Sequence, residues 1–354
     1  GSPVYLTPKM DKQEEIYTQA MQYLDDAIAD LQKEDLIDPE AQDLLYQGDA
    51  EKWLKLAYGL KARYTMHLLK RSANKDADME KVLEYVNNSF ESAEEQAAFD
   101  VYDANNINPL YGFFVARAGL GASESMRSKL AEYNDPRLSR AFITKQGTSG
   151  KEQAPGTADN AVYAPNGTPE QGTSKYGTSL FMYSISAPTL LLSYHELKFL
   201  EAEALCRLER DAKSALKDAV VAGLLNAENS FTISRKELGK TLINAASSIT
   251  EAEAESYFDN TIEAKYTAEP LKTTMTQKYF ALWGASGEAT ESYNDVRRMK
   301  GLGENFIELK NPNSFPLRCP YGNSDTTTNA EVKAAYGNGQ YVYSENVWWA
   351  GGSR

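Results

Sequence analysis

The sequence contains few of the residues that most often carry out catalysis or bind metals. Its 354 residues include two cysteines and two histidines. Two cysteines, Cys206 and Cys319, cannot build a disulfide framework, and the sequence leaves open whether they pair. His195 is followed by Glu196, but the second histidine of a zinc-binding His-Glu-x-x-His motif is missing. We therefore expect no metal site and no cofactor, and we interpret His67 and His195 as helix residues with local partners.

Other absences exclude whole classes of protein. Lys and Arg total 37 against 50 Asp and Glu, a net charge of −13, which argues against a surface for nucleic acid. The sequence has no apolar run of the roughly 18 residues that a membrane span needs, no glycine-rich phosphate loop and no Gly-x-Ser-x-Gly elbow. Carboxylate pairs such as Glu201 and Glu203 point to different sides of a helix, so no spacing selects a glycosidase pair. We expect a protein that is not an enzyme, with a glycoside hydrolase as one alternative.

What the sequence does contain is amphipathic helices. Between Pro188 and Asn226, apolar residues recur at three- and four-residue steps. This pattern predicts a helix from Thr189 to Leu208, opened by Pro188, and a second helix capped by Asp211. The two helices would form an antiparallel hairpin, and a second hairpin is predicted over residues 51–90.

Further helices are predicted before, between and after the hairpins, over 11–31, 123–132, 271–283 and 288–299 and from Ser234 and Thr250 onward. The helix over 11–31 is expected to open with a capping pair, Asp11 and Glu14, and to bury a stripe of apolar residues that includes Ile16 and Tyr23. In the helix over 51–71, a basic flank that includes Lys61 and Arg63 is expected to be a solvated face. No convincing strands are predicted.

The predicted fold class is mainly α, with tetratricopeptide-like helix hairpins and a large loop-rich part. The helical hairpin core covers roughly 11–92 and 188–300, with a loop-rich insertion over 93–187 and a loop-rich C-terminal region over 301–354. The hairpins are not contiguous, whereas a regular solenoid repeats at roughly 34 residues. Between 147 and 178 small and polar residues dominate, and a segment of this kind and length is usually functional or disordered.

A series of short motifs occurs along the chain in an order that is itself informative. The motifs are Leu44-Leu45-Tyr46-Gln47-Gly48-Asp49 with the helix after it, Asp135-Pro136-Arg137-Leu138, Tyr194-His195-Glu196 through Ala204, Gln277-Lys278-Tyr279, Asp295-Val296-Arg297-Arg298, Phe315-Pro316-Leu317-Arg318 and the closing Trp348-Trp349. Together they resemble the SusD/RagB-like nutrient-binding outer-membrane lipoproteins. Tyr279 and Tyr293 stand where that family often has Trp. Because the motif residues look structural, the resemblance transfers no binding residue.

The resemblance implies one SusD-like unit over 1–354, a helical scaffold with a loop-rich half. It also implies a cell-surface protein of a Bacteroidetes-type bacterium that captures glycan or peptide and passes it to a SusC-like TonB-dependent outer-membrane transporter. The family's signal peptide, lipidated cysteine and first helices are absent from this sequence. The chain is therefore interpreted as a truncated or proteolysed part of a lipid-anchored outer-membrane protein. A purely structural helical scaffold is the other alternative.

The candidate ligand-binding residues are aromatics in or beside the loops. Tyrosine occurs 22 times, against 12 Phe and 4 Trp, and its apolar ring with a polar tip suits a wet binding surface. A partly exposed ring offers a platform for the apolar face of a sugar, while Asn, Thr, Ser and Gln nearby bind its hydroxyl groups. We predict a site at Tyr163, Tyr176, Phe181 and Tyr183, with Tyr102 and Tyr111 as a second group; the alternative is that these rings pack under the loops. The helix aromatics Trp53, Tyr194, Tyr257 and Tyr279 are assigned to the core.

Overall fold

The computed structural model of the chain describes residues 7–34, 40–117, 120–146, 151–153, 162–167, 176–243 and 245–353. Most of the predicted 147–178 loop therefore lies outside the described residues. The α-helices are α1 (Gln13–Leu31), α2 (Ala50–His67), α3 (Lys75–Asn87), α4 (Pro109–Arg117), α5 (Glu124–Glu132), α6 (Tyr194–Arg207), α7 (Lys213–Leu238), α8 (Glu251–Tyr257), α9 (Glu263–Ala268), α10 (Pro270–Ala281), α11 (Ala289–Leu302), α12 (Asn323–Thr328) and α13 (Ala330–Tyr336).

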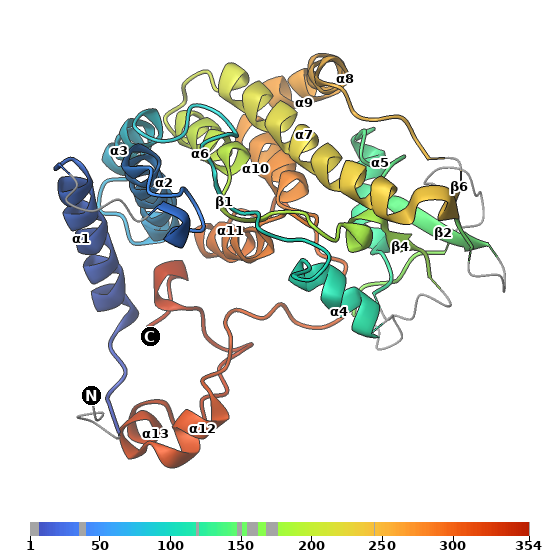
Figure 1. The fold of residues 1–354 in the computed structure, drawn as a ribbon. Coiled ribbons are helices and arrows are strands. Elements are labelled where there is room, and N and C mark those ends of the chain that lie inside the picture. Colours follow the sequence, from blue (N-terminus) through green and yellow to red (C-terminus); the bar gives the residue numbers. More distant parts are fainter. Residues whose placement is uncertain are drawn as a thin grey trace.

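The strands are short and form two small sheets. One pairs β1 (Ala97–Phe99) with β5 (Thr189–Leu192) in antiparallel fashion; the other has the order β4 (Thr178–Ser179), β2 (Phe142–Gln146), β3 (Lys151–Gln153), β6 (Leu242–Ile243), with only the β3–β6 pair parallel. Single turns of 3₁₀ or π helix lie at η1 (Glu40–Gln42), η2 (Leu68–Lys70), η4 (Leu180–Tyr183), η5 (Gly239–Thr241), η6 (Phe258–Ile262) and η7 (Trp348–Ala350). The larger sheet lies at the end of the molecule away from α1, and α12 and α13 project on the side of the N-terminus (Figure 1). The dominance of helices confirms the mainly α fold class.

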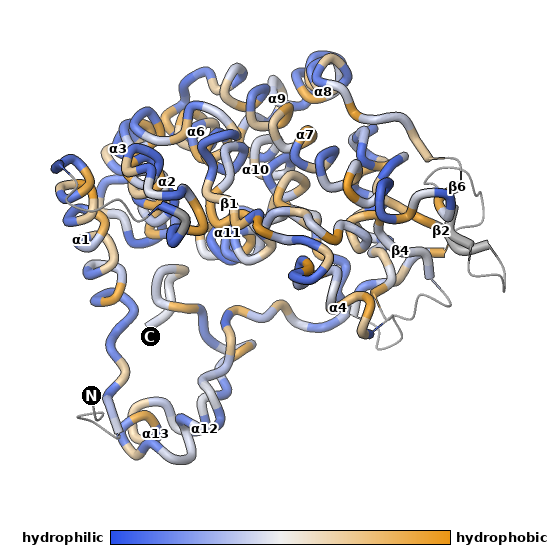
Figure 2. The backbone as a smooth tube through the Cα atoms, in the orientation of Figure 1, coloured by the Kyte–Doolittle hydropathy of each residue, from blue (hydrophilic) through white to orange (hydrophobic). Residues whose placement is uncertain are grey.

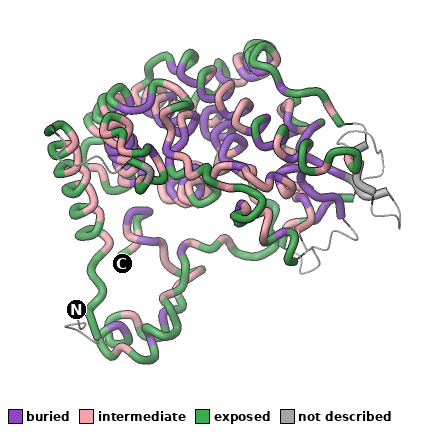
Figure 3. Tube along the Cα trace, viewed as in Figure 1, coloured by how far each residue is buried: buried purple, intermediate pink, exposed green. Residues whose placement is uncertain are grey.

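Both predicted hairpins form, α2 with α3 and α6 with α7. Helix α6 packs against α2 and α3 on one side and against α7 and α10 on the other. On one side Leu197 and Leu200 of α6 join a buried cluster with α2 and α3, and on the other Phe199 joins a second cluster with α7 and α10. Buried residues concentrate in these helices (Figure 3), while the hydropathy colouring alternates along most of the others (Figure 2). Because α6 is covered on both sides, eight of its residues are buried, including the polar side chains of His195, Glu196 and Glu203.

The structure corrects two predicted helix starts in this central region. Residues 189–192 form strand β5 rather than the first turn of a helix, and α6 begins only after Ser193, whose Oγ accepts a hydrogen bond from Glu196 N at 3.0 Å. The side chains of β5 alternate between covered and exposed, as they must in a strand with one face on the core. Further on, α7 continues through Ser234, where a separate helix was predicted. Ser234 Oγ donates to Ser230 O inside the helix at 3.0 Å instead of capping a new one.

Other predictions fail at the edges of the fold. Helix α1 buries none of its residues: Ile16 is 54% and Tyr23 64% exposed, and Lys12 is an N-cap without a side-chain bond, so the Asp11–Glu14 capping pair is not formed. The reason is position, since α1 lies at the edge of the molecule (Figures 1 and 3) and contacts α2 and η7. Helices α12 and α13 occupy a region that was expected to be loop. The two cysteines are both free thiols.

The predicted basic flank over 51–71 is solvated only in part: Lys70 and Arg71 are exposed, but two residues of α2 are buried. Lys61 and Arg63 are each only 7% exposed. Lys61 forms an ion pair with Asp25 of α1, and Arg63 reaches two carboxylates from distant parts of the chain. Arg63 Nε donates to Glu196 Oε1 at 3.1 Å, and its Nη2 lies 2.8 Å from Glu288 Oε1. Sequence reasoning overlooked these pairs because each partner lies far away in the sequence.

A second group of buried charges continues this arrangement through α6, α10 and α11. Arg298 Nη1 and Nη2 bind the two oxygens of Glu203 at 2.5 and 2.7 Å, and Nη2 also lies 2.8 Å from Asp295 Oδ1. Lys278 Nζ lies 2.8 Å from Asp295 Oδ2. We call the set Arg63, Glu196, Glu203, Lys278, Glu288, Asp295 and Arg298 the buried ion network. It connects α2, α6, α10 and α11.

Two carboxyl groups of the network share the guanidinium of Arg63, and they take opposite protonation states. Burial acts to raise the pKa of Glu196, but the charges of Arg63 and Lys278 outweigh it and the pKa is lowered. For Glu288, burial and the neighbouring charge of Glu196 raise the pKa well above its ordinary value. Glu288 is therefore the proton-carrying member, and Ser193 Oγ lies 2.5 Å from its Oε2. This follows from the general rule that two like charges sharing a buried site do not both ionise.

We predict that Glu288→Gln becomes increasingly stable, relative to the unsubstituted protein, as the pH rises. The folded state keeps a proton on Glu288 that the unfolded chain loses above pH 4.5, so the stabilisation by this carboxyl is present below that pH and is lost as the pH rises. Gln keeps the shape and has no proton to lose. Urea unfolding between about pH 5 and pH 8 should show the difference in free energy of unfolding growing by up to about 1.4 kcal/mol per pH unit.

Glu203→Gln is the matched control for this experiment. Burial acts to raise the pKa of Glu203, but Arg298 and Arg207 outweigh it and hold the pKa far below its usual range. Its stabilising charge is therefore fully present above the unfolded pKa of 4.5, and the loss caused by this substitution should be constant across the same pH range. A Glu288→Gln difference that is also constant would contradict the assignment of the proton.

Candidate functional site

A cavity of about 1020 Å³ lies between α5, α10 and two loop segments, 162–166 and 306–312. Its walls therefore come from three regions that are far apart in the sequence. The volume is in the range of pockets that bind small ligands. We call it the loop-side cavity.

Aromatic rings form the apolar part of this cavity. Tyr133, at the C-terminal end of α5, and Phe306 are half-buried and line it. The Tyr133 ring packs edge-on against Phe280, with 5.3 Å between ring centroids, and Lys265 Nζ lies 4.5 Å from its centroid. These contacts hold the ring in one orientation, as a stacking platform requires. Sequence reasoning missed both residues. Tyr133 directly follows the predicted helix over 123–132, and no motif of polar loop residues surrounds Phe306.

The predicted residues Tyr163 and Tyr176 also line the cavity, but each is only 6% exposed. Tyr163 packs edge-on against Phe142, with 5.2 Å between centroids, and the guanidinium carbon of Arg127 lies 5.2 Å from its ring centroid. Gly177 allows this packing, because a Cβ there would lie 2.8 Å from Tyr163 Cε1 and 2.7 Å from Ile143 O. Tyr163 and Tyr176 therefore form the floor of the cavity and present little ring surface to a ligand.

Polar groups complete the cavity and tie its walls together. Ser123 Oγ donates to Asn166 Oδ1 at 2.8 Å, and Asn166 Nδ2 donates to Asn311 Oδ1 at 3.3 Å. These two bonds connect the start of α5 to both loop segments. The side chains of Ser125, Ser128 and Thr276 add hydroxyl groups to the lining. Flat apolar rings next to hydroxyl, amide and charged groups can bind a sugar or another ligand with one apolar and one polar face.

The other four predicted residues lie outside this cavity. Phe181 is 2% exposed and stacks on Phe231 in the core, with 4.5 Å between centroids. Tyr183 packs edge-on against Phe114 of α4. The hydroxyl of Tyr102 lies 2.9 Å from Thr189 Oγ1, and the hydroxyl of Tyr111 donates to Glu237 Oε1 at 3.1 Å. The structure thus brings together Tyr163 and Tyr176 and leaves the others separate.

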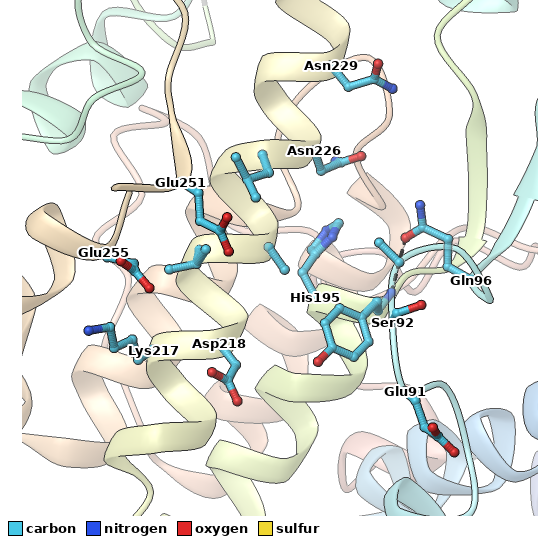
Figure 4. Close-up of a pocket in the computed structure, with 15 residues that line it drawn as sticks. Glu91, Ser92, Gln96, His195, Lys217, Asp218, Asn226, Asn229, Glu251 and Glu255 are labelled. Atoms are coloured by element: carbon cyan, nitrogen blue, oxygen red, sulfur yellow. Dashed lines mark hydrogen bonds between the residues drawn. The ribbon is translucent and has the colours of Figure 1, made fainter. Parts of the chain in front are cut away.

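A second, smaller cleft of about 460 Å³ lies on the helical side, between the loop 91–96 and helices α6, α7 and α8. Figure 4 shows Asp218, Asn226 and Asn229 along α7 facing Glu91, Ser92 and Gln96. Gln96 is partly engaged, because its Oε1 accepts a hydrogen bond from Tyr194 N at 3.2 Å. His195 also borders the cleft, and burial lowers its pKa to about 4, so it is neutral at physiological pH. With one aromatic ring, Tyr194, this cleft offers less stacking surface than the loop-side cavity.

Two features are absent from the described residues. These residues contain no group of three or more His, Cys, Asp or Glu side chains that could hold a metal ion. Nor does any helix in the described ranges combine the length and the apolar character that crossing a bilayer would take.

The helix hairpins, with a loop-rich end that contains a cavity lined by aromatic rings, define a mainly helical class of protein. A family model described as "Starch-binding associating with outer membrane" matches residues 2–321, and the chain belongs to this SusD-like family. A solved SusD/RagB family protein from Bacteroides thetaiotaomicron is 66% identical over 100% of this chain and 76% of that one, with a TM-score of 0.95. Family membership supports a surface glycan-binding role and an association with the outer membrane.

More distant solved structures share the fold. A chitin-binding protein is 20% identical over 99% of this chain and 75% of its own, with a TM-score of 0.70. A SusD homologue from Bacteroides fragilis is 19% identical over 97% of this chain and 76% of its own, with a TM-score of 0.72. No curated protein sequence matches the chain.

The motifs that carry the resemblance are structural in this protein. Glu196, Glu203, Lys278, Asp295 and Arg298 are all members of the buried ion network. The Asp135-Pro136-Arg137 motif forms another buried pair: Arg137 Nε and Nη2 bind the two oxygens of Asp135 at 2.8 and 2.7 Å, and Nη1 donates to Phe280 O at 2.7 Å. This last bond fixes the end of α5 to α10, and so sets Tyr133 against Phe280.

We predict that the floor and the wall of the loop-side cavity respond differently to truncation. Tyr163→Ala should lower the free energy of unfolding by about 3 kcal/mol or more, because it removes a buried ring and leaves a hole. Tyr133→Ala should cost about 1–2 kcal/mol, because that ring is half exposed. Urea unfolding of the two variants measures this. Equal losses, or a larger loss for Tyr133→Ala, would show that the division into floor and wall is wrong.

Proposed function

We propose that this protein is a non-enzymatic cell-surface binding protein that captures an oligosaccharide in the loop-side cavity and passes it to a SusC-like TonB-dependent transporter. A peptide is the second ligand class that the family resemblance allows. The full-length protein would be held at the outer membrane by a lipid anchor. The observation that carries the proposal is the presence of two aromatic rings, Tyr133 and Phe306, beside hydroxyl and amide groups in one cavity.

The chemistry of the lining favours a sugar. A pyranose presents apolar C–H faces and a rim of hydroxyl groups, so it is recognised by flat rings together with short hydrogen-bonding side chains. The family is described as starch-binding and a structural neighbour as chitin-binding. Starch and chitin are both polysaccharides. Tyr163 and Tyr176 keep a place in the proposed site as its floor.

The arrangement of carboxyl groups does not favour the hydrolase alternative. A glycosidase needs a carboxylic acid that stays protonated beside the scissile bond and a second carboxylate facing it. Glu288 has a raised pKa, but it belongs to the buried ion network and does not line the cavity. Glu308 does line the cavity, but its hydrogen bond to Lys310 and the charge of that lysine lower its pKa. We therefore assign binding without turnover.

We also propose a division of labour along the chain. Regions 11–92 and 188–300 form the helical support, while 93–187 and 301–354 supply most of the ligand site and the face toward the transporter. The cavity agrees with this division, because α5 with 162–166 comes from one loop-rich region and 306–312 from the other. Only the α10 wall belongs to the helical support.

A glycan array followed by titration calorimetry tests the binding proposal. For the oligosaccharide that binds most tightly, Tyr133→Ala and Phe306→Ala should each weaken binding by about 0.5–1.5 kcal/mol, the range of aromatic contacts. The double variant should lose about tenfold or more in affinity. Tyr23→Ala is the matched control, because that ring is 64% exposed on α1, far from the cavity in sequence. Unchanged affinity in the double variant, or reducing-end release by the unsubstituted protein, would contradict the proposal.

Hydrogen exchange with and without the transporter that co-purifies with the protein tests the delivery step. We expect added protection in the described loop segments 162–167 and 306–315, because loop-rich segments can cover large areas of a partner. Amides of α3 and α6 should exchange at the same rate in both samples. Protection confined to the helix hairpins would refute the proposed face.

A further inference from the structure

Three lysines reach the loop-side cavity from three different segments, and one of them differs from the other two. Lys272 of α10 is paired with Glu269 at 2.8 Å, and Lys310 of the 306–312 segment is paired with Glu308. Lys129 of α5 donates to Ser125 Oγ at 2.8 Å, and no carboxylate oxygen of the described residues lies within ion-pair distance of its Nζ. An ammonium group has three donors, so two remain for another partner.

The surroundings of Lys129 make this arrangement unusual. The protein carries a net charge of −13, so carboxylates are abundant, yet this lysine is half-buried beside a neutral hydroxyl. The carboxylates that line the cavity are Glu124, Glu132 and Glu308. Glu124 lies 3.6 Å from Arg127 and Glu308 is paired with Lys310, whereas the exposed Glu132 forms no ion pair with the described residues. Burial lowers the pKa of Lys129, because the charged form is poorly hydrated there.

The position of Lys129 relative to the stacking ring defines what it can bind. Lys129 and Tyr133 are four residues apart at the end of α5, so their Cβ atoms are neighbours about 5–6 Å apart on one helix face. A pyranose stacked on Tyr133 would therefore bring a charged ring substituent within reach of the Lys129 ammonium group. Lysine binds such an anion as a point charge with three rotatable donors.

Building on the proposed glycan-binding function, we propose that the loop-side cavity selects oligosaccharides that contain a hexuronate, and that Lys129 binds the sugar carboxylate. Lys129 is then the residue that determines specificity, and Tyr133 and Phe306 supply stacking that neutral and acidic sugars share. A sulfate ester on a neutral sugar carries the same charge in a different geometry, and the experiment separates it from the carboxylate.

The test is calorimetric titration with galacturonate, glucuronate and mannuronate oligosaccharides, with neutral oligosaccharides of the same length and linkage, and with their sulfated forms. At least one hexuronate should bind about tenfold or more tightly than its neutral counterpart, which is the scale of one charge-assisted hydrogen bond. Lys129→Met should remove that difference and leave the affinity for the neutral sugar within about twofold. Lys129→Gln should behave in the same way, and both variants should keep the melting temperature of the unsubstituted protein. Preference for the sulfated forms alone would overturn the carboxylate assignment.

The result separates this inference from the function on which it rests. If neutral and acidic sugars bind equally, or if both Lys129 variants keep the preference for the hexuronate, the role of Lys129 is refuted while the glycan site stands. If no sugar binds, or if Tyr133→Ala leaves the affinity of every bound sugar unchanged, the glycan site itself is refuted together with the inference. Lys272→Met is the matched control, because Lys272 already has Glu269 as a partner. It should leave the preference for the hexuronate in place.

Discussion

The pairing of Arg298 with Glu203 is the interaction on which the rest of the fold depends. Both side chains are completely buried, and the guanidinium binds both oxygens of the carboxylate. Removing one member of such a pair costs about 3–5 kcal/mol, because the other charge is left without a partner in the core. Replacing the pair by matched apolar side chains can be neutral, so its main effect is to fix which helices meet and in which register. Here α6 and α11 are held together, and Asp295 and Lys278 extend the constraint to α10.

The same constraint reaches the cavity through α10. Lys278 belongs to the buried ion network, and two residues later the carbonyl of Phe280 accepts the bond from Arg137. The Asp135–Arg137 pair thus fixes the end of α5 against a helix that the network already holds in place. Tyr133 lies between these contacts, and its ring packs on Phe280. The helical support therefore sets the position of the ring, while the walls opposite it come from the loop segments 162–166 and 306–312.

The sequence predicts much of this fold and little of this site. The helices predicted over 123–132 and from Thr250 onward both form with these starts, because a cap and an apolar stripe are local signals. Arg63 was predicted to be exposed and 189–192 to be helical, and both predictions were wrong. Arg63 pairs with Glu196 and Glu288, and β5 pairs with β1, and all of these partners are distant in sequence. Four of the six candidate site residues lie outside the loop-side cavity for the same reason. Tyr163 and Tyr176 do reach the cavity, but which rings show a face to it depends on packing between three separate segments.

The central claim is that the fixed helices present a sugar-binding cavity on the loop-rich side. A crystal structure with a bound oligosaccharide tests this claim most directly. We predict that the sugar occupies the loop-side cavity, with one ring stacked on Tyr133 or Phe306 and hydroxyl groups bonded to the polar side chains of α5 and the 162–166 segment. The helices of the buried ion network should not move. A ligand in the helical-side cleft between α6, α7 and α8, with the loop-side cavity left open, would contradict the account.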